Sequence, residues 1–256
     1  MLEILDTQII SYVLKGRSGL PLGGKTISAI TANEFLMVQG SNLVRANYYI
    51  PVLSRLHFPE STDGISPTSR RLGIAHPFRK IVTDQVIVDF GNEHPTIVEY
   101  GNLALSLLIN KQVSGIFYEA IKFLDKQQRK TIRKRFDFLL ENNVKCQPLT
   151  KTSVKVAMEL LQEFGKEHNL KENFRNSFND MLILASAIAT SALLITEDSL
   201  LNKFASKQFA GAYQRQDGIA TIDFSQNLPA ARRNSREGKG YINKSWRVSF
   251  KNYHQS

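Results

Sequence analysis

Residues 178–201 read FNDMLILASAIATSALLITEDSLL, and this stretch decides the fold. The small and apolar residues after Asp180 predict a helix that begins near residue 179 and runs to residue 190. Residues 193–195 are a short apolar run typical of a buried strand, and Asp198 follows it at the start of a second, short helix. A strand between two helices favours a layered α/β fold.

The N-terminal residues show a similar alternation of elements. Residues 2–16 read LEILDTQIISYVLKG, which predicts a buried strand at 2–5 ending at Asp6 and a helix that ends at Gly16. The remaining expected elements are a loop at 16–25, a strand at 26–30, a helix from Thr31, a strand at 86–90, helices at 103–109 and 113–141, a strand at 144–149 and a helix at 153–165. Strands that alternate with helices predict a doubly wound parallel sheet flanked by helices.

The pattern loosens in two parts of the chain, and these define the expected domain organisation. We expect one α/β domain over residues 1–228 and a basic C-terminal extension over residues 229–256. Within the domain, residues 42–101 are interrupted repeatedly by proline. This interruption predicts a surface insertion that contacts substrate or a partner.

The composition is that of a soluble globular protein, with 42% hydrophobic and 22% charged residues. The longest run without charge, residues 181–196, is shorter than the roughly 20 apolar residues that a bilayer requires. No basic leader precedes the first strand. Cys146 is the only cysteine, which excludes a disulfide within the chain and fits a reducing compartment. We therefore expect a cytoplasmic protein.

The formal net charge of +10 favours a polyanionic partner such as nucleic acid. The cations gather in two stretches, which are Lys122, Lys126, Arg129, Lys130, Arg133, Lys134 and Arg135, and then Arg232, Arg233, Arg236, Lys239, Lys244, Arg247 and Lys251. Such runs are also typical of a solvated helix face and a disordered tail. The second stretch is interleaved with the aromatic residues Tyr241, Trp246, Phe250 and Tyr253. Aromatic residues among cations suit base stacking on single strands, which favours RNA.

Four acids stand where the predicted elements begin or end: Asp6, Glu34, Asp180 and Asp198. In an open α/β sheet, ligands bind beyond the carboxyl ends of the strands. A parallel sheet therefore brings these element ends to one edge. Carboxylates gathered there repel one another unless a divalent cation neutralises them, and Mg²⁺ or Mn²⁺ takes oxygen ligands.

Each acid also has a structural interpretation. Thr31 and Glu34 satisfy the pattern of a capping box, in which the glutamate caps its own helix. Asp180 could serve only the helix dipole, and Asp198 could be a helix N-cap. Asp6 is harder to explain in this way, because an acid that ends a buried strand costs stability unless it is paired or liganded.

Three segments together carry a resemblance to the PIN-domain nucleases, above all to their toxin-like branch: residues 2–16, residues 27–38 (ISAITANEFLMV) and residues 178–201. That family has an acid after the first strand, a Thr-x-x-Glu helix start, an acid that opens a helix of small and apolar residues, and a strand ending in Thr-x-Asp. The resemblance implies a PIN-like fold. It places the four acids in the family's order, with Thr196 as the hydroxyl residue beside the last one.

The resemblance also implies an activity, an endoribonuclease that depends on Mg²⁺ or Mn²⁺. It implies Asp6, Asp180 and Asp198 as metal ligands and Glu34 as a ligand or water-positioning group. A structured RNA such as tRNA is the implied substrate and an antitoxin protein the implied partner, and a homodimer is left open. The candidate substrate contacts are Thr196, Arg129, Arg133, Arg232 and Arg233. The alternatives are a PIN-like module that binds RNA or protein without cutting, and a structure-specific DNA nuclease.

One further sequence pattern does not indicate a binding site. Residues 19–26 read GLPLGGKT, which satisfies the P-loop pattern letter for letter. A P-loop follows a strand and opens a helix, so that its amides face phosphate. Here a helix is expected before the motif and a strand after it, and Pro21 removes an amide, so a surface loop is the better interpretation.

The five histidines are scattered without metal-ligand spacing, so no zinc site is expected.

Overall fold

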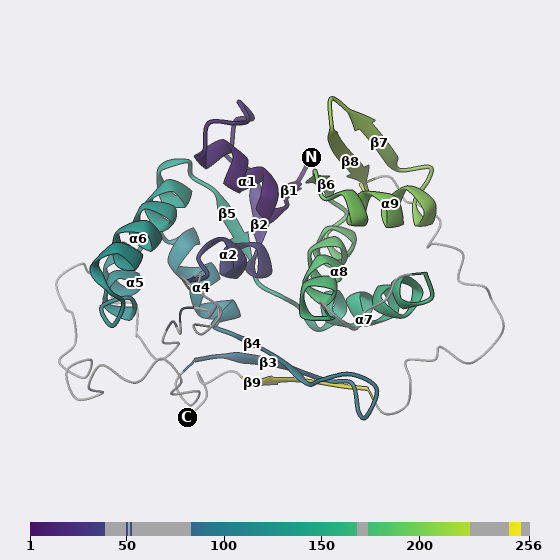
Figure 1. Cartoon of the computed structure of the whole chain (residues 1–256), viewed down its shortest axis with the longest axis horizontal. Helices are drawn as coiled ribbons and strands as arrows, with labels where there is room; N and C mark the ends of the chain where they lie inside the picture. The colour runs from purple at the N-terminus through teal and green to yellow at the C-terminus, as the bar shows by residue number, and fades with distance from the viewer. Residues whose placement is uncertain (39–49, 51, 53–82, 168–173, 226–245, 252–256) are drawn as a thin grey trace.

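The computed structural model describes residues 1–38, 50, 52, 83–167, 174–225 and 246–251 (Figure 1). Within these residues, the main sheet has six strands in the order β5-β2-β1-β6-β8-β7. The strands are β1 (Glu3–Leu5), β2 (Thr26–Ser28), β5 (Lys145–Gln147), β6 (Leu193–Thr196), β7 (Tyr213–Gln216) and β8 (Ile219–Asp223). The first four are parallel, and β8 and β7 continue the sheet as an antiparallel hairpin. The α/β fold is therefore the one predicted, a mostly parallel sheet flanked by helices.

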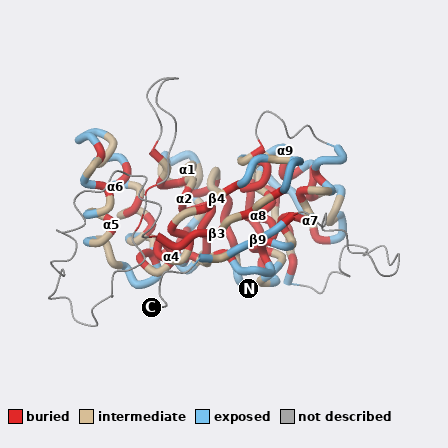
Figure 2. The backbone as a smooth tube through the Cα atoms, turned by 90° about the horizontal axis from the view of Figure 1, so that it is seen from below, coloured by how far each residue is buried: buried red, intermediate tan, exposed pale blue. Residues whose placement is uncertain are grey.

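The helices divide between the two faces of this sheet. They are α1 (Thr7–Leu14), α2 (Ala29–Phe35), α4 (Asn102–Asn110), α5 (Ser114–Ala120), α6 (Lys126–Glu141), α7 (Lys151–Gly165), α8 (Phe174–Ala189) and α9 (Ser199–Gln208). In β1, Ile4 packs with the apolar residues of α7, α8 and α9, whereas Leu5 packs with those of α1, α4, α5 and α6. Because successive side chains of a strand point to opposite faces, one short strand supports both halves of the core. Figure 2 shows the buried residues along the strands and the inner sides of the helices.

A second sheet of three strands, in the order β4-β3-β9, lies beside α7 and α8 (Figure 1). Its strands are β3 (Gln85–Asp89), β4 (Ile97–Tyr100) and β9 (Arg247–Lys251), and all pairs are antiparallel. Val86 and Val88 of β3 are buried in the same apolar cluster as α7 and α8. The end of the predicted insertion and part of the predicted tail thus pair with each other and complete one side of the core.

Several expected elements begin at other residues than the sequence predicts. The first turn of α2 starts at Ala29 rather than at Thr31, because the buried Ser28 is the N-cap and its hydroxyl accepts a hydrogen bond from the backbone N–H of Thr31 at 3.0 Å. The helix predicted from residue 179 begins earlier, at Phe174. The helix predicted over 113–141 is two helices, α5 and α6, with Asp125 capping the second.

The aromatic residues of the C-terminal stretch are also placed differently. Trp246 is 7% exposed, and its indole N–H donates to Glu93 at 3.1 Å. Its ring meets that of Phe90 edge to face, with centroids 4.9 Å apart. Phe250 packs against the same core from β9. The expectation that Trp246 stacks on bases is therefore wrong, while Tyr241 and Tyr253 lie outside the described residues. No described helix has the length and apolar character needed to cross a membrane.

Candidate active site

Asp6 lies directly after β1 at the carboxyl edge of the parallel strands. It is 5% exposed, and its backbone N–H donates to the carbonyl of Ile195 in β6 at 3.0 Å. One carboxylate oxygen accepts a hydrogen bond from the backbone N–H of Thr7 at 2.6 Å, and the other accepts one from the hydroxyl of Thr196, also at 2.6 Å. The parallel pairing of β1 and β6 thus brings the ends of two distant segments together at this acid.

Asp198 lies two residues beyond β6 and caps α9. One oxygen accepts a hydrogen bond from the backbone N–H of Leu201 at 2.7 Å, so the interpretation of Asp198 as an N-cap is confirmed. The other oxygen lies 3.4 Å from the side-chain amide nitrogen of Gln8 in α1. The backbone N–H of Asp198 donates to the hydroxyl of Thr196 at 3.0 Å. Asp198 therefore both caps α9 and lies close to Asp6.

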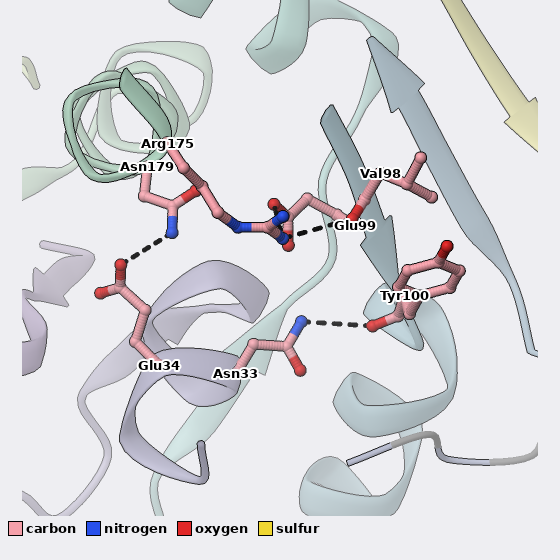
Figure 3. Close-up of polar contacts among 7 residues, drawn as sticks. All are labelled: Asn33, Glu34, Val98, Glu99, Tyr100, Arg175 and Asn179. Carbon is pink, nitrogen blue, oxygen red and sulfur yellow. Dashed lines mark hydrogen bonds and ion pairs between the residues drawn. The ribbon is translucent and has the colours of Figure 1, made fainter. Parts of the chain in front are cut away.

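Glu34 does not cap α2, so the capping-box interpretation is wrong. Ser28 holds that position, and Glu34 is the last residue but one of the helix. One of its oxygens accepts a hydrogen bond from the hydroxyl of Thr7 at 2.6 Å. The other accepts one from the side-chain amide of Asn179 in α8 at 2.8 Å (Figure 3). Contacts from α1 and α8 therefore hold both oxygens of this carboxylate.

Asp180 follows Asn179 in the second turn of α8, because that helix begins at Phe174. The expectation that Asp180 opens the helix, and with it a role confined to the helix dipole, is wrong. Burial raises the pKa of Asp180 well above its ordinary value, and the negative charges of Asp6, Asp198 and Glu34 raise it further. The other three acids of the sequence analysis therefore lie within electrostatic reach of Asp180.

Asp6 is buried, and Glu34, Asp180 and Asp198 are partly exposed. Burial, together with the charges of Glu34 and Asp198, raises the pKa of Asp6 from 3.8 to about 6, against the opposing hydrogen bonds from Thr196 and Thr7. Burial also raises the pKa of Glu34, and the nearby Arg175 guanidinium opposes that shift. Buried carboxylates that repel one another favour the binding of either protons or a cation.

The donors fit a hard divalent cation by their chemistry. All four are carboxylates, and Mg²⁺ takes oxygen ligands while it keeps several waters of its own. Among the described residues, no group of three or more His, Cys, Asp or Glu side chains lies close enough together to form a preformed metal site. The fit therefore rests on the type of donor and on electrostatics, and not on a preformed coordination geometry.

The other predicted site residues lie in different places. Thr196 is fully buried at the centre of the site. Arg129 and Arg133 lie on α6, on the far side of α2 from α8 (Figure 1). The guanidinium of Arg133 covers the ring of Tyr118 at 3.8 Å, and Arg129 lies 3.5 Å from the backbone carbonyl of Lys122. Arg232 and Arg233 lie outside the described residues.

Sequence reasoning gave no role to Thr7, Gln8 and Asn179, whose side chains contact these acids, or to Arg175, whose charge lowers the pKa of Glu34. Thr7 and Asn179 each adjoin a predicted acid, and that adjacency was the available signal. Arg175 and its partner Glu99 in β4 carried no such signal. Residues 19–26 join α1 to β2, so the P-loop pattern stands in the order helix, loop, strand, as expected.

Comparison with known protein families agrees with this geometry. Residues 113–207 match the family model of the PIN domain, a superfamily made up typically of nucleases. The match contains Asp180, Asp198 and Thr196, and the mostly parallel sheet flanked by helices is consistent with the PIN fold. Asp6 and Glu34 precede the matched residues. Searches of curated proteins and of solved structures gave no match.

Proposed function

We propose that this protein is a Mg²⁺- or Mn²⁺-dependent endoribonuclease that hydrolyses RNA phosphodiester bonds. The observation that carries the proposal is the gathering of Asp6, Glu34, Asp180 and Asp198 from three distant parts of the chain. Burial raises the pKa of Asp6, Glu34 and Asp180, and repulsion from the neighbouring acids adds to the shift of Asp6 and Asp180. A purely structural cluster has no need of such repulsion, whereas a nuclease site uses it to attract the cation.

Each residue has a distinct task in this proposal. Asp6, Asp180 and Asp198 would hold the cation, which when bound activates water and stabilises charge on the phosphate. Thr196 fixes the carboxylate of Asp6, and Thr7 and Asn179 fix that of Glu34. Because burial raises the pKa of Glu34, this residue is suited to accept a proton from the attacking water.

The substrate class follows from charge. The net charge of +10 favours a polyanion, and α6 presents the exposed cations Lys126, Lys130, Arg133 and Lys134. We infer that this face contacts the phosphates of a structured RNA such as tRNA, with Arg129 and Arg133 among the contacts and Arg232 and Arg233 supplied by the C-terminal stretch. An antitoxin protein that blocks the site is the partner expected of a toxin-like nuclease.

Cleavage of labelled RNA by the purified chain tests the proposal. We expect products with Mn²⁺ or Mg²⁺, no products with chelator, and loss of cleavage in Asp6→Asn and Asp180→Asn. Asp217→Asn is the matched control, because Asp217 is exposed in the β7–β8 turn at a φ of 51°, which asparagine tolerates. Full activity in both site variants, or products that persist in chelator, would refute the proposal. DNA as a parallel substrate separates an RNA nuclease from a DNA nuclease.

A further inference from the structure

An ion pair between the buried Glu99 and the partly exposed Arg175 joins the second sheet to the helix that carries Asp180. Glu99 of β4 is 1% exposed, and one of its oxygens accepts a hydrogen bond from the Arg175 guanidinium at 2.6 Å. The same guanidinium nitrogen donates to the backbone carbonyl of Val98 at 3.2 Å (Figure 3). Arg175 belongs to the first turn of α8, so the pair fixes the start of that helix to β4.

The pair lies one helical turn from the proposed site. Residues four apart lie on the same face of a helix, so Arg175 and Asn179 project together from α8 (Figure 3). Asn179 donates to Glu34. The residue before Glu34, Asn33, donates to the backbone carbonyl of Tyr100 in β4 at 3.3 Å. Two consecutive residues of α2 are thus held by the same two elements that the ion pair joins.

A gain in stability does not explain why Glu99 and Arg175 are paired here. Burial raises the pKa of Glu99 to about 7 even though Arg175 opposes the shift, and the charge of Glu34 contributes to it. Among the described residues, the second carboxylate oxygen of Glu99 has no hydrogen-bond partner. Burial of a carboxylate that is not fully paired costs stability, even when its partner Arg175 is partly exposed. A costly pair at this place therefore points to a requirement of geometry.

We propose that Glu99 and Arg175 are positioning residues of the nuclease site, which tie α8 to β4 so that Asn179 holds Glu34 in its working orientation. The inference rests on the proposed function and extends it. The site then depends on a strand that precedes the residues matching the PIN family. It also depends on β9, because β9 pairs with β3, the neighbour of β4.

Kinetics of matched variants test the proposal. We expect Arg175→Met and Glu99→Gln each to lower kcat by about tenfold or more with little change in KM. Arg175→Lys should restore part of the loss, and the double variant should be no worse than Arg175→Met alone, because the two residues act as a unit. Glu163→Gln is the control, since it breaks an exposed pair with Lys166 on α7. Wild-type kcat in both single variants, or strictly additive losses, would overturn the proposal.

A second measurement does not depend on activity. The side-chain amide signal of Asn179, followed by NMR, should shift in Arg175→Met and Glu99→Gln and stay in place in Glu163→Gln. If the wild-type chain cuts no RNA but this signal shifts, the proposed function fails and the positioning role stands. If the chain cuts RNA and the signal is unmoved, only the positioning role fails. Thermal unfolding of each variant identifies any loss of activity that is due to unfolding.

Discussion

The hydroxyl of Thr196 donates a hydrogen bond to the carboxylate of Asp6 at 2.6 Å, although the two residues are 190 positions apart in the sequence. The same hydroxyl accepts the backbone N–H of Asp198 at 3.0 Å. One buried side chain therefore sets the orientation of Asp6 and the start of the loop that carries Asp198. The hydroxyl of Thr196 links two of the three proposed metal ligands.

Removal of this hydroxyl should damage the site. We expect Thr196→Val to lower the free energy of unfolding by about 1–3 kcal/mol, because a buried carboxylate and a buried N–H lose their partner. Cleavage should fall by about tenfold or more, since Asp6 is no longer held. Thr196→Ser should keep most of both. Denaturant unfolding and RNA cleavage measure the two effects, with the exposed Thr131→Val as the control. Equal behaviour of the valine and serine variants would contradict the assignment.

Stability in the absence of divalent metal should depend on pH through Asp6. The folded protein holds the proton of this carboxyl more tightly than the unfolded chain, because its pKa rises from 3.8 to about 6. The free energy of unfolding should therefore fall as pH rises through this range, by about 3 kcal/mol from Asp6. Asp6→Asn lacks this contribution, so the wild-type value minus the variant value should decrease between these pH limits. A difference that is flat or rises would contradict the burial of the ionisable acid.

Divalent cations should offset the loss of stability that ionisation of Asp6 causes. We expect Mg²⁺ or Mn²⁺ to raise Tm, and to raise it more at about pH 7.5 than at about pH 5, because the ligands must lose their protons before they bind the metal. Asp180→Asn should lose most of the increase, whereas Asp217→Asn should keep it. Differential scanning fluorimetry with and without cation measures the shift. An equal rise in the Asp180 variant would indicate binding elsewhere.

The role of Ser28 as the N-cap of α2 can be tested separately from RNA cleavage. Ser28→Ala should lower the free energy of unfolding by about 1 kcal/mol, because Ser28 caps the helix. Glu34→Gln should leave stability unchanged and reduce cleavage, since Glu34 faces the site. Chemical denaturation and cleavage assays on both variants check this separation. Wild-type stability in Ser28→Ala would contradict the assignment of Ser28 as the N-cap.

The exposed cations of α6 should strengthen the binding of RNA. We expect the double variant Lys130→Gln and Lys134→Gln to raise KM for RNA and to weaken its dependence on salt, because fewer counterions are released when phosphates bind. Lys151 and Lys155, which are exposed on α7, provide the matched double control. Titration of RNA binding at several salt concentrations measures the slope. Equal slopes in both double variants would exclude α6 as the RNA-binding face.

The sequence predicts the parallel strands of the main sheet because these features are local, but it does not predict the hairpin of β7 and β8. The apolar run before Asp6 and the small, apolar helix after Asp180 each occupy a few consecutive residues. Helix starts were less predictable. The capping pattern at Thr31 and Glu34 competes with Ser28, and only tertiary packing decides between them. Helix α8 begins five residues before the sequence suggests, at Phe174 rather than at residue 179, and the ring of Phe174 makes a long-range contact with that of Phe90.

The second sheet could not be predicted in the same way. Strand β4 is four residues long, and β9 lies in a basic stretch whose run of charge is typical of a disordered tail. Their pairing with β3 is long-range, so no local pattern records it. Glu99 looks like an ordinary surface glutamate in the sequence. Its role depends on contact with Arg175, and this contact exists only after both sheets have formed.

The pairing of Val86 with Phe250 has a consequence for the synthesis of the chain. While the ribosome is still making the protein, β3 has one edge without a neighbour, from its own appearance until residues 247–251 emerge. An open strand edge can pair with other chains and lead to aggregation. The second sheet is thus completed only after β9 has been made. The partner that covers this edge of β3 therefore appears only after all the strands of the main sheet described here have been made.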